Sequence, residues 1–283
     1  MTTTGAATHA EPRNHDLARR TVSGVLLAVV VLASVSTLPT FTVVVLVIAL
    51  GSLWELAGLS ARNGQGLIFP VAAVAVACYV LLAALGLQHR YEKELLAGTL
   101  LASVAVSLFG SRQGFLARSA FTLFGVIYIG WLSSYFLALR NLPQVGTAYT
   151  IAAIVLVALT DTFAMLVGIA IGRTPLSPIS PRKTVEGALG GLIASSAAGA
   201  SLALLPQIGI PWWQGLFVGA ITSIAAQAGD LIESALKRDA RVKDAGTLLG
   251  GHGGVLDRFD SYILGGIAFY GAMFVTGHIA PMR

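Results

Sequence analysis

The chain is poor in charged residues. Only 11% of its 283 residues are Asp, Glu, Lys or Arg, whereas 55% are hydrophobic. A soluble globular protein uses roughly a quarter of its residues as charged side chains. This shortage excludes a water-soluble enzyme, and the mean hydropathy of +0.80 indicates a protein of the lipid bilayer.

Cysteine is nearly absent too, since Cys78 is the only one. A single cysteine excludes a disulfide framework and any metal cluster built on cysteine ligands. Cys78 lies in the apolar run VAVACYVLL, where we interpret it as a small membrane-buried residue. Low-complexity tracts are also missing, which excludes a fibrous or disordered protein.

Long apolar runs take the place of the missing charge. A hydrocarbon core of ~30 Å needs about 20 apolar residues per helix. Nine runs of about this length occur, at 21–38, 40–59, 66–87, 95–110, 119–139, 147–172, 187–205, 212–236 and 259–278. They lack the period-2 alternation of barrel strands, so each is predicted to be a helix. The predicted fold class is all-α, a polytopic integral membrane helix bundle of about nine transmembrane helices, with a turn at Pro39 and a short, tilted or re-entrant fourth run.

Basic residues favour one orientation. With a cytoplasmic N-terminus, 14 of the 18 Lys and Arg residues fall on the inner side. The predicted organisation is a disordered cytoplasmic tail at 1–20, N-terminal transmembrane helices at 21–139 and a C-terminal transmembrane catalytic region at 140–283. Two cytoplasmic loops, 173–186 and 237–258, belong to the last region. A signal peptide at the N-terminus is the alternative.

Acidic residues concentrate in the second half, where eight of the 13 Asp and Glu lie between Asp161 and Asp260. An ionisable group at membrane depth costs at least ~2.5 to 3.5 kcal/mol, so it indicates function by default. Asp161 and Asp230 both lie within apolar runs. The alternative for each is a buried acid paired with a neighbouring Arg or Lys.

Helical spacing groups several of these acids. Asp230, Glu233, Ser234 and Lys237 follow the i, i+3, i+4, i+7 pattern, which puts them on one helix face. Asp257 and Asp260 are three residues apart at the start of the ninth run. Carboxylates that converge at a membrane boundary favour a divalent cation, and hard oxygen ligands suit Mg²⁺.

Two loops supply candidate phosphate ligands. SPISPRKTVEG carries Arg182 and Lys183 between prolines that fix its turns. In GGHGGVLDR, glycines let backbone N–H groups approach an anion closely. His252 is predicted to be a general base, a hydrogen-bond donor to a phosphate group or simply a turn residue. Each loop alone is also compatible with an ordinary cytoplasmic turn.

At these residues the chain resembles the phosphatidate cytidylyltransferases, also called CDP-diacylglycerol synthases. The family signature S-x-x-K-R-x4-K-D-x-G-x2-(L/I/F)-(P/G)-x-H-G-G-x-x-D-R-x-D is matched over 234–260, except that Gly250 stands where proline is commoner. The segments QAGDLIES, SPISPRKTVEGALGG and DTFA at 161–164 are similar to the family as well.

The resemblance implies that CTP and phosphatidic acid react to give CDP-diacylglycerol and pyrophosphate in phospholipid biosynthesis. It implies Mg²⁺ held by Asp230 and Asp257, with a second cation left open. The candidate catalytic residues are Asp230, Asp257, Lys237, Arg238, Lys243, Asp244, His252 and Arg258. The candidate substrate-binding residues are Asp161, Ser180, Arg182, Lys183, Thr184, Glu186, Glu233, Ser234, Gly253, Gly254 and Asp260.

The expected setting is a bacterial plasma membrane, with the active site facing the cytoplasm. Expected partners are CTP, phosphatidic acid and membrane lipid, without nucleic acid; a homodimer is left open. One alternative is a CTP-dependent lipid or polyprenol kinase, which also needs metal and basic loops. The other is a cation-coupled transporter, which predicts internal repeats that the sequence lacks.

Overall fold

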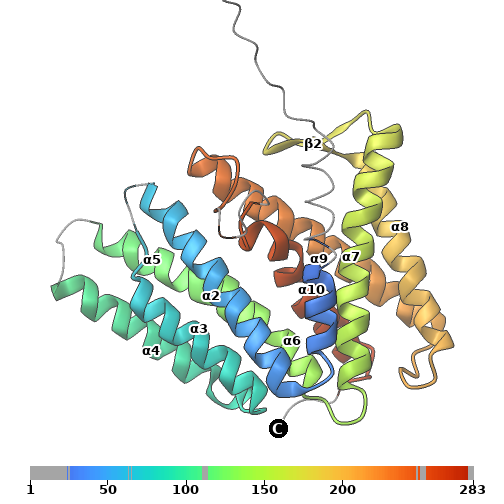
Figure 1. Ribbon diagram of the computed structural model, residues 1–283, viewed down its shortest axis with the longest axis horizontal. Helices are drawn as coiled ribbons and strands as arrows, with labels where there is room; N and C mark the ends of the chain where they lie inside the picture. The colour runs from blue at the N-terminus through green and yellow to red at the C-terminus, as the bar shows by residue number, and fades with distance from the viewer. Residues whose placement is uncertain are drawn as a thin grey trace, which may run out of the picture.

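The computed structural model is a bundle of helices with one small β-hairpin at one end (Figure 1). It describes residues 24, 26–62, 64, 66–109, 114–246, 248 and 253–279. The predicted disordered tail at 1–20 and His252 lie outside these residues. The all-α membrane bundle predicted from the sequence is confirmed.

Each of the nine apolar runs contains a helix in the described part of the chain. Residues 26–34 are helical. The others are α2 (Leu38–Arg62), α3 (Phe69–Ala84), α4 (Gln88–Phe109), α5 (Phe115–Gly125) continued through η1 (Val126–Trp131) into α6 (Leu132–Arg140), α7 (Gly146–Ile171), α8 (Val185–Ser201) with a short η2 (Leu202–Leu204), α9 (Trp212–Asp239) and α10 (Leu256–Val275).

Five of these helices are long and apolar enough to cross a membrane: α2, the continuous helix Phe115–Arg140, α7, α8 with η2, and α9. Helix α3 is apolar but shorter. Helix α4 begins with the charged turn QHRYEKE and α10 with LDRFD. The number of crossings and the orientation of the N-terminus stay predictions.

Local boundaries differ from the predicted ones. The turn between the first two helices lies at 35–37, and Pro39 is in the first turn of α2. Proline is tolerated there because the first helical N–H groups have no partner in the helix. Helix α4 starts at Gln88, well before the predicted residue 95, and its 22 residues form a full-length helix. The π-helical segment η1 was not predicted.

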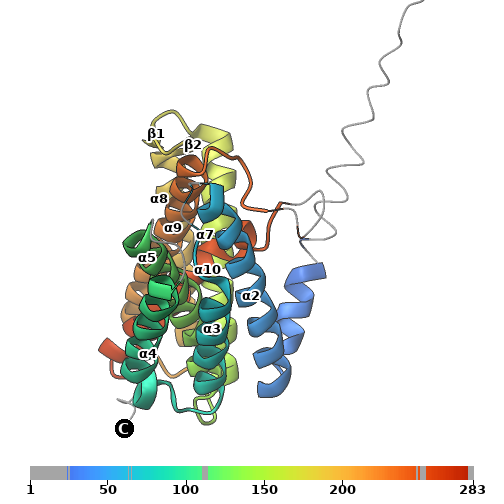
Figure 2. The ribbon, with the colours of Figure 1, turned by 90° about the vertical axis from the view of Figure 1, so that its left-hand side faces the viewer.

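The predicted loop 173–186 contains the hairpin, which adds two strands to the all-α prediction. Strands β1 (Pro175–Ser177) and β2 (Ser180–Thr184) pair antiparallel. The loop predicted at 237–258 is shorter, since α9 continues to Asp239 and α10 begins at Leu256. The hairpin lies at the end of the bundle opposite the turns that join α3 to α4 and α6 to α7 (Figures 1 and 2).

Helices α7, α8 and α9 approach one another closely through small residues. A Cβ on Gly191 of α8 would collide with the Thr160 carbonyl of α7, and one on Gly219 of α9 with the Ser195 carbonyl of α8. The Ser195 hydroxyl donates a hydrogen bond to the Gly219 carbonyl at 3.0 Å. Small residues at helix contacts are typical of membrane bundles, because lipid supplies no hydrophobic force between helices.

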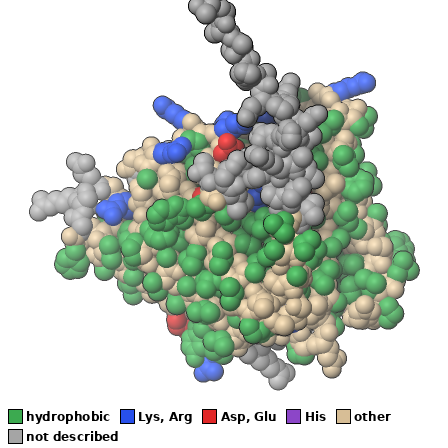
Figure 3. All heavy atoms as spheres, in the orientation of Figure 1, with side chains coloured by type: hydrophobic (Ala, Val, Ile, Leu, Met, Phe, Trp, Pro, Cys, Tyr) green, Lys and Arg blue, Asp and Glu red, His purple; other side chains and the backbone are tan. Residues whose placement is uncertain are grey.

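The surface divides into an apolar flank and a basic end. Hydrophobic side chains cover the flank seen in Figure 3, and most of its visible Lys and Arg side chains lie along the edge near the hairpin. Exposed apolar residues include Val43, Val74, Leu101 and Ile193. This distribution suits a flank in contact with lipid and an end in water.

Candidate active site

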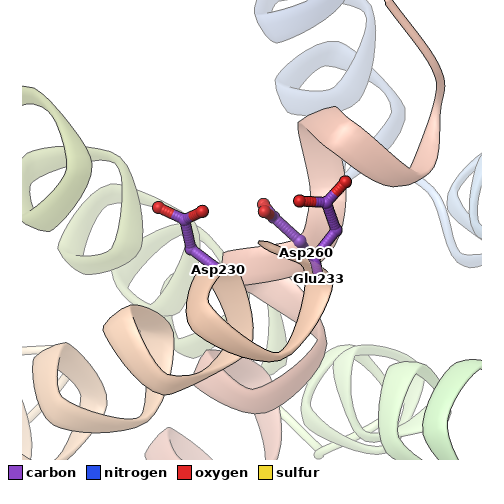
Figure 4. Close-up of side chains that lie close together, drawn as sticks. All are labelled: Asp230, Glu233 and Asp260. Atoms are coloured by element: carbon purple, nitrogen blue, oxygen red, sulfur yellow. The ribbon is translucent and has the colours of Figure 1, made fainter. Parts of the chain in front are cut away.

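Three carboxylates from two helices come together at the centre of the site. Asp230 and Glu233 come from α9 and Asp260 from α10; one oxygen of each lies within 4.8 Å of the others. Glu233 is 0% and Asp260 7% exposed, whereas Asp230 is half-buried. Figure 4 shows the three carboxylate groups on neighbouring turns of the two helices. Close, sheltered oxygen ligands fit a hard divalent cation.

The helices meet here because a glycine lets them approach. A Cβ on Gly229 would collide with the Asp260 carbonyl, so the backbones of α9 and α10 nearly touch beside Asp230. The hydroxyl of Tyr128, from η1, also reaches the Gly229 carbonyl, at 3.4 Å. The spacing of Asp230 and Glu233 was recognised in the sequence; their meeting with Asp260 depends on this helix contact.

Two lysines neutralise part of this negative charge. The Lys183 ammonium from β2 lies 2.6 Å from Asp230 Oδ2. The Lys237 ammonium lies 2.5 Å from Glu233 Oε2 and 2.8 Å from Asp257 Oδ1. Buried carboxylates without such partners would be strongly destabilising. The lysines therefore balance part of the charge of Asp230, Glu233 and Asp257.

Asp257 has a different environment from the three-carboxylate group. Besides Lys237, it accepts hydrogen bonds from the backbone N–H groups of Ala245, at 3.0 Å, and Gly254, at 2.8 Å. Its carboxylate therefore joins Ala245 and Gly254, two described residues of the linker between α9 and α10. The role of Asp257 as a metal ligand stays a prediction.

The hairpin closes one side of a polar cavity of about 370 Å³. The cavity lies between α7, α8, α9 and the hairpin, and its polar lining consists of Asp161, Ser180, Arg182, Lys183, Thr184, Gln227 and Asp230. Its volume falls within the range of roughly 300 to 1,000 Å³ typical of ligand pockets. It thus brings together the predicted basic loop and the first acid of the α9 face.

Local hydrogen bonds fix the hairpin above this cavity. The Thr184 hydroxyl accepts from the Gly187 N–H at 3.1 Å and caps the N-terminus of α8. The Glu186 carboxylate accepts from the N–H groups of Arg173, at 3.1 Å, and Thr174, at 3.2 Å. Glu186, predicted to bind substrate, thus ties the base of the hairpin together and is not among the residues that line the cavity.

The remaining predicted residues occupy varied positions. Arg238, Lys243, Asp244 and Arg258 are exposed, whereas Ser234 is buried within α9. Gly253 has a positive φ of 82°, a conformation that glycine adopts without strain. Asp161 accepts a hydrogen bond from the Ser261 hydroxyl of α10 at 3.1 Å.

A second, mostly apolar groove was missed by the sequence analysis. It measures about 430 Å³ and lies between residues 24–32, α7 and α10. Asp161 and Arg258 are the charged residues in its described lining, and Asp161 also lines the polar cavity. A smaller apolar cavity of about 50 Å³ shares Val31, Ile154 and Phe259 with the groove and continues to α2. No sequence signal identifies the groove, because its walls come from three distant segments.

Comparison with known proteins identifies the family of the chain. The model of the cytidylyltransferase family matches residues 18–276. The chain is 44% identical over 144 residues to the phosphatidate cytidylyltransferase of Bacillus subtilis (strain 168), covering 50% of this chain and 54% of that protein. It is 39% identical over 181 residues to phosphatidate cytidylyltransferase 4, chloroplastic, of Arabidopsis thaliana, covering 54% and 45%. The matched region thus spans about half the length of these relatives.

Proposed function

Because the chain belongs to the cytidylyltransferase family, we propose that it transfers the cytidylyl group of CTP to phosphatidic acid, giving CDP-diacylglycerol and pyrophosphate. The observation that carries this proposal is the position of Asp161, which lines both the polar cavity and the apolar groove. One site is thereby open to a water-soluble substrate and to a lipid.

The polar cavity suits the triphosphate of CTP. Arg182 and Lys183 line it from the hairpin, and Asp230 lines it from α9. Charge-assisted contacts from Lys and Arg are the usual ligands of phosphate groups. When a triphosphate enters, Lys183 exchanges Asp230 for a phosphate oxygen, which leaves that carboxylate available to a cation.

The apolar groove suits phosphatidic acid. Its walls of Leu, Val, Phe and Ala side chains accept acyl chains. The guanidinium group of Arg258, in the same lining, binds the phosphate head group. The lipid phosphate would then lie near Asp161, on the side where the groove and the polar cavity meet.

The carboxylates of Asp230, Glu233 and Asp260 fit Mg²⁺, with Asp257 as the further ligand predicted from the sequence. A bound Mg²⁺ neutralises charge that develops on the phosphates and the leaving group. A second cation remains open in this scheme. The contribution of the chain itself is to hold both substrates in line and to keep Lys183 and Lys237 beside the transferred group.

The reaction requires no nucleophile from the protein. A phosphate oxygen of phosphatidic acid is already ionised and forms a bond to the α-phosphorus of CTP, while the bond from this phosphorus to the bridging oxygen breaks. Pyrophosphate leaves with the electron pair of that bond. Preorganised ammonium and guanidinium groups stabilise the added negative charge most strongly in a site shielded from water.

We also propose that the chain is an integral protein of a bacterial plasma membrane, with about nine crossings and the N-terminus and active site on the cytoplasmic side. Support comes from the basic end at the hairpin (Figure 3) and from the need of CTP to reach the cavity from the cytoplasm.

Radiolabelled CTP tests the reaction. Purified protein is incubated with phosphatidic acid and CTP labelled on the α-phosphate. We expect a lipid product that contains both the label and cytidine, together with release of pyrophosphate. Chelation of Mg²⁺ should abolish formation of the lipid product and of pyrophosphate. A kinase would instead transfer the γ-phosphate and release CDP. Transfer of γ-label alone refutes the proposal, and absence of transfer to any lipid phosphate favours the transporter.

A further inference from the structure

Glu55 is a buried acid in the part of the chain that precedes the signature motifs. It lies on α2, is only 3% exposed, and accepts a hydrogen bond from the Leu256 N–H at 2.8 Å across 201 residues of sequence. Leu256 is the first residue of α10. A carboxylate at this position pairs with the positive end of the helix dipole.

The same carboxylate lies against two glycines of the loop. A Cβ added to Gly246 or to Gly254 would collide with the carboxylate of Glu55. Neither glycine has a positive φ, so a side chain at either position would conflict with the Glu55 carboxylate and not with the backbone conformation. One turn earlier on α2, a Cβ on Gly51 would lie 3.4 Å from the Val255 side chain, so the end of the loop rests on this face of α2.

Glu55 and Asp257 thus both contact the described residues at 245–246 and 254. Asp257 accepts from the N–H groups of Ala245 and Gly254, next to or at the residues that Glu55 contacts. Asp257 is joined through Lys237 to Glu233 of the carboxylate group. A displacement of these residues would therefore change the position of the start of α10, which carries Asp257 in its first turn and Asp260 three residues later.

We propose that Glu55 is a positioning residue for cytidylyl transfer: its carboxylate fixes Gly246, Gly254 and the start of α10 against α2. The effect on turnover rests on the proposed function, whereas the effect on the position of the loop does not. The proposal is therefore tested by two measurements, thiol labelling of the loop and enzymatic turnover.

Thiol labelling reads the loop without reference to activity. Ala245 is buried, so in a Cys78→Ala background an Ala245→Cys protein should react slowly with maleimide. Adding Glu55→Gln, which removes the charge at nearly constant volume, should raise the labelling rate about tenfold or more. The matched control is Glu94→Gln, because Glu94 is exposed on α4. An unchanged rate with Glu55→Gln and with Glu55→Ala overturns the proposal.

Turnover is measured on the same variants without the added cysteine. Loss of a charge-assisted hydrogen bond should lower kcat about tenfold to a hundredfold. The KM for CTP should change little, since the polar cavity is not lined by Glu55. A kcat that stays at the wild-type level contradicts the proposal. If wild-type protein shows no cytidylyl transfer, the proposed function fails while the labelling result still decides on Glu55.

A double-mutant cycle isolates the contact itself. Gly246→Ala alone should accelerate labelling of the Ala245→Cys protein and lower kcat, because its methyl group displaces the Glu55 carboxylate. In a Glu55→Ala background the same substitution has room, so it should add little further loss. Equal effects of Gly246→Ala in both backgrounds would show that the glycine is needed for another reason and would overturn the proposal.

Discussion

At the scale of single residues, Asp230 and Asp257 have different surroundings, although the sequence analysis predicted both as metal ligands. Asp230 lies in the three-carboxylate group and is half-exposed to the polar cavity, whereas Asp257 is tied to Lys237 and to two backbone N–H groups. Both side chains are carboxylates, but of the two only Asp257 also accepts hydrogen bonds from the backbone between α9 and α10.

We therefore expect two different responses to near-isosteric changes. Asp230→Asn should lower turnover at least about a hundredfold with little change in melting temperature, because its ion pair with Lys183 is partly exposed and loss of its charge relieves repulsion from Glu233 and Asp260. Asp257→Asn should also lose turnover and, in addition, reduce the free energy of unfolding by about 1.5 to 3 kcal/mol, since it weakens charge-assisted hydrogen bonds. Activity assays and thermal denaturation in detergent measure both, with Glu94→Gln as control. Substantial activity of Asp230→Asn would refute its assignment as a metal ligand.

At the scale of helices and strands, close packing of α8 between α7 and α9 holds the hairpin over the cavity. Gly219→Ala should destabilise the protein, because its Cβ collides with the Ser195 carbonyl. Gly271→Ala is the matched control: Gly271 lies within α10, with nothing within 4 Å of its Cβ. There alanine should be neutral or stabilising by up to about 1 kcal/mol, given its higher helix propensity. Equal melting temperatures of the two variants would contradict this account of the packing.

Sequence patterns predicted the helices but not their exact ends or the short elements between them. Hydropathy identified the run at 212–236 but not the extra turn to Asp239, because charged residues end an apolar run without ending a helix. The hairpin was predicted as a loop, since a three-residue and a five-residue strand offer no periodicity to detect. The π-helical turn Val126–Trp131 likewise has the composition of an ordinary membrane helix.

At the scale of the whole molecule, orientation in the membrane is open to a direct test. Lys243 is exposed in the loop between α9 and α10, and Leu204, 81% exposed, lies at the far end of α8 from the hairpin. In a Cys78→Ala background, Lys243→Cys should react with impermeant maleimide only from the cytoplasmic side. Leu204→Cys should react only from the outer side. The reverse pattern would invert the proposed topology, and labelling of both from one side would refute a crossing by α9, the helix between these two positions.

The sequence by itself determined the membrane bundle, the approximate helix positions, the family and the set of polar residues from which the site is built. These follow from local properties: apolar run length, residue spacing on one helix, and an uninterrupted motif. Only the tertiary structure decided that Asp260 joins Asp230 and Glu233, that Asp161 lines two cavities, and that Glu55 holds the glycine-rich loop. Each of these depends on which helices pack together. Contacts across as many as 201 residues leave no periodic pattern in a single sequence.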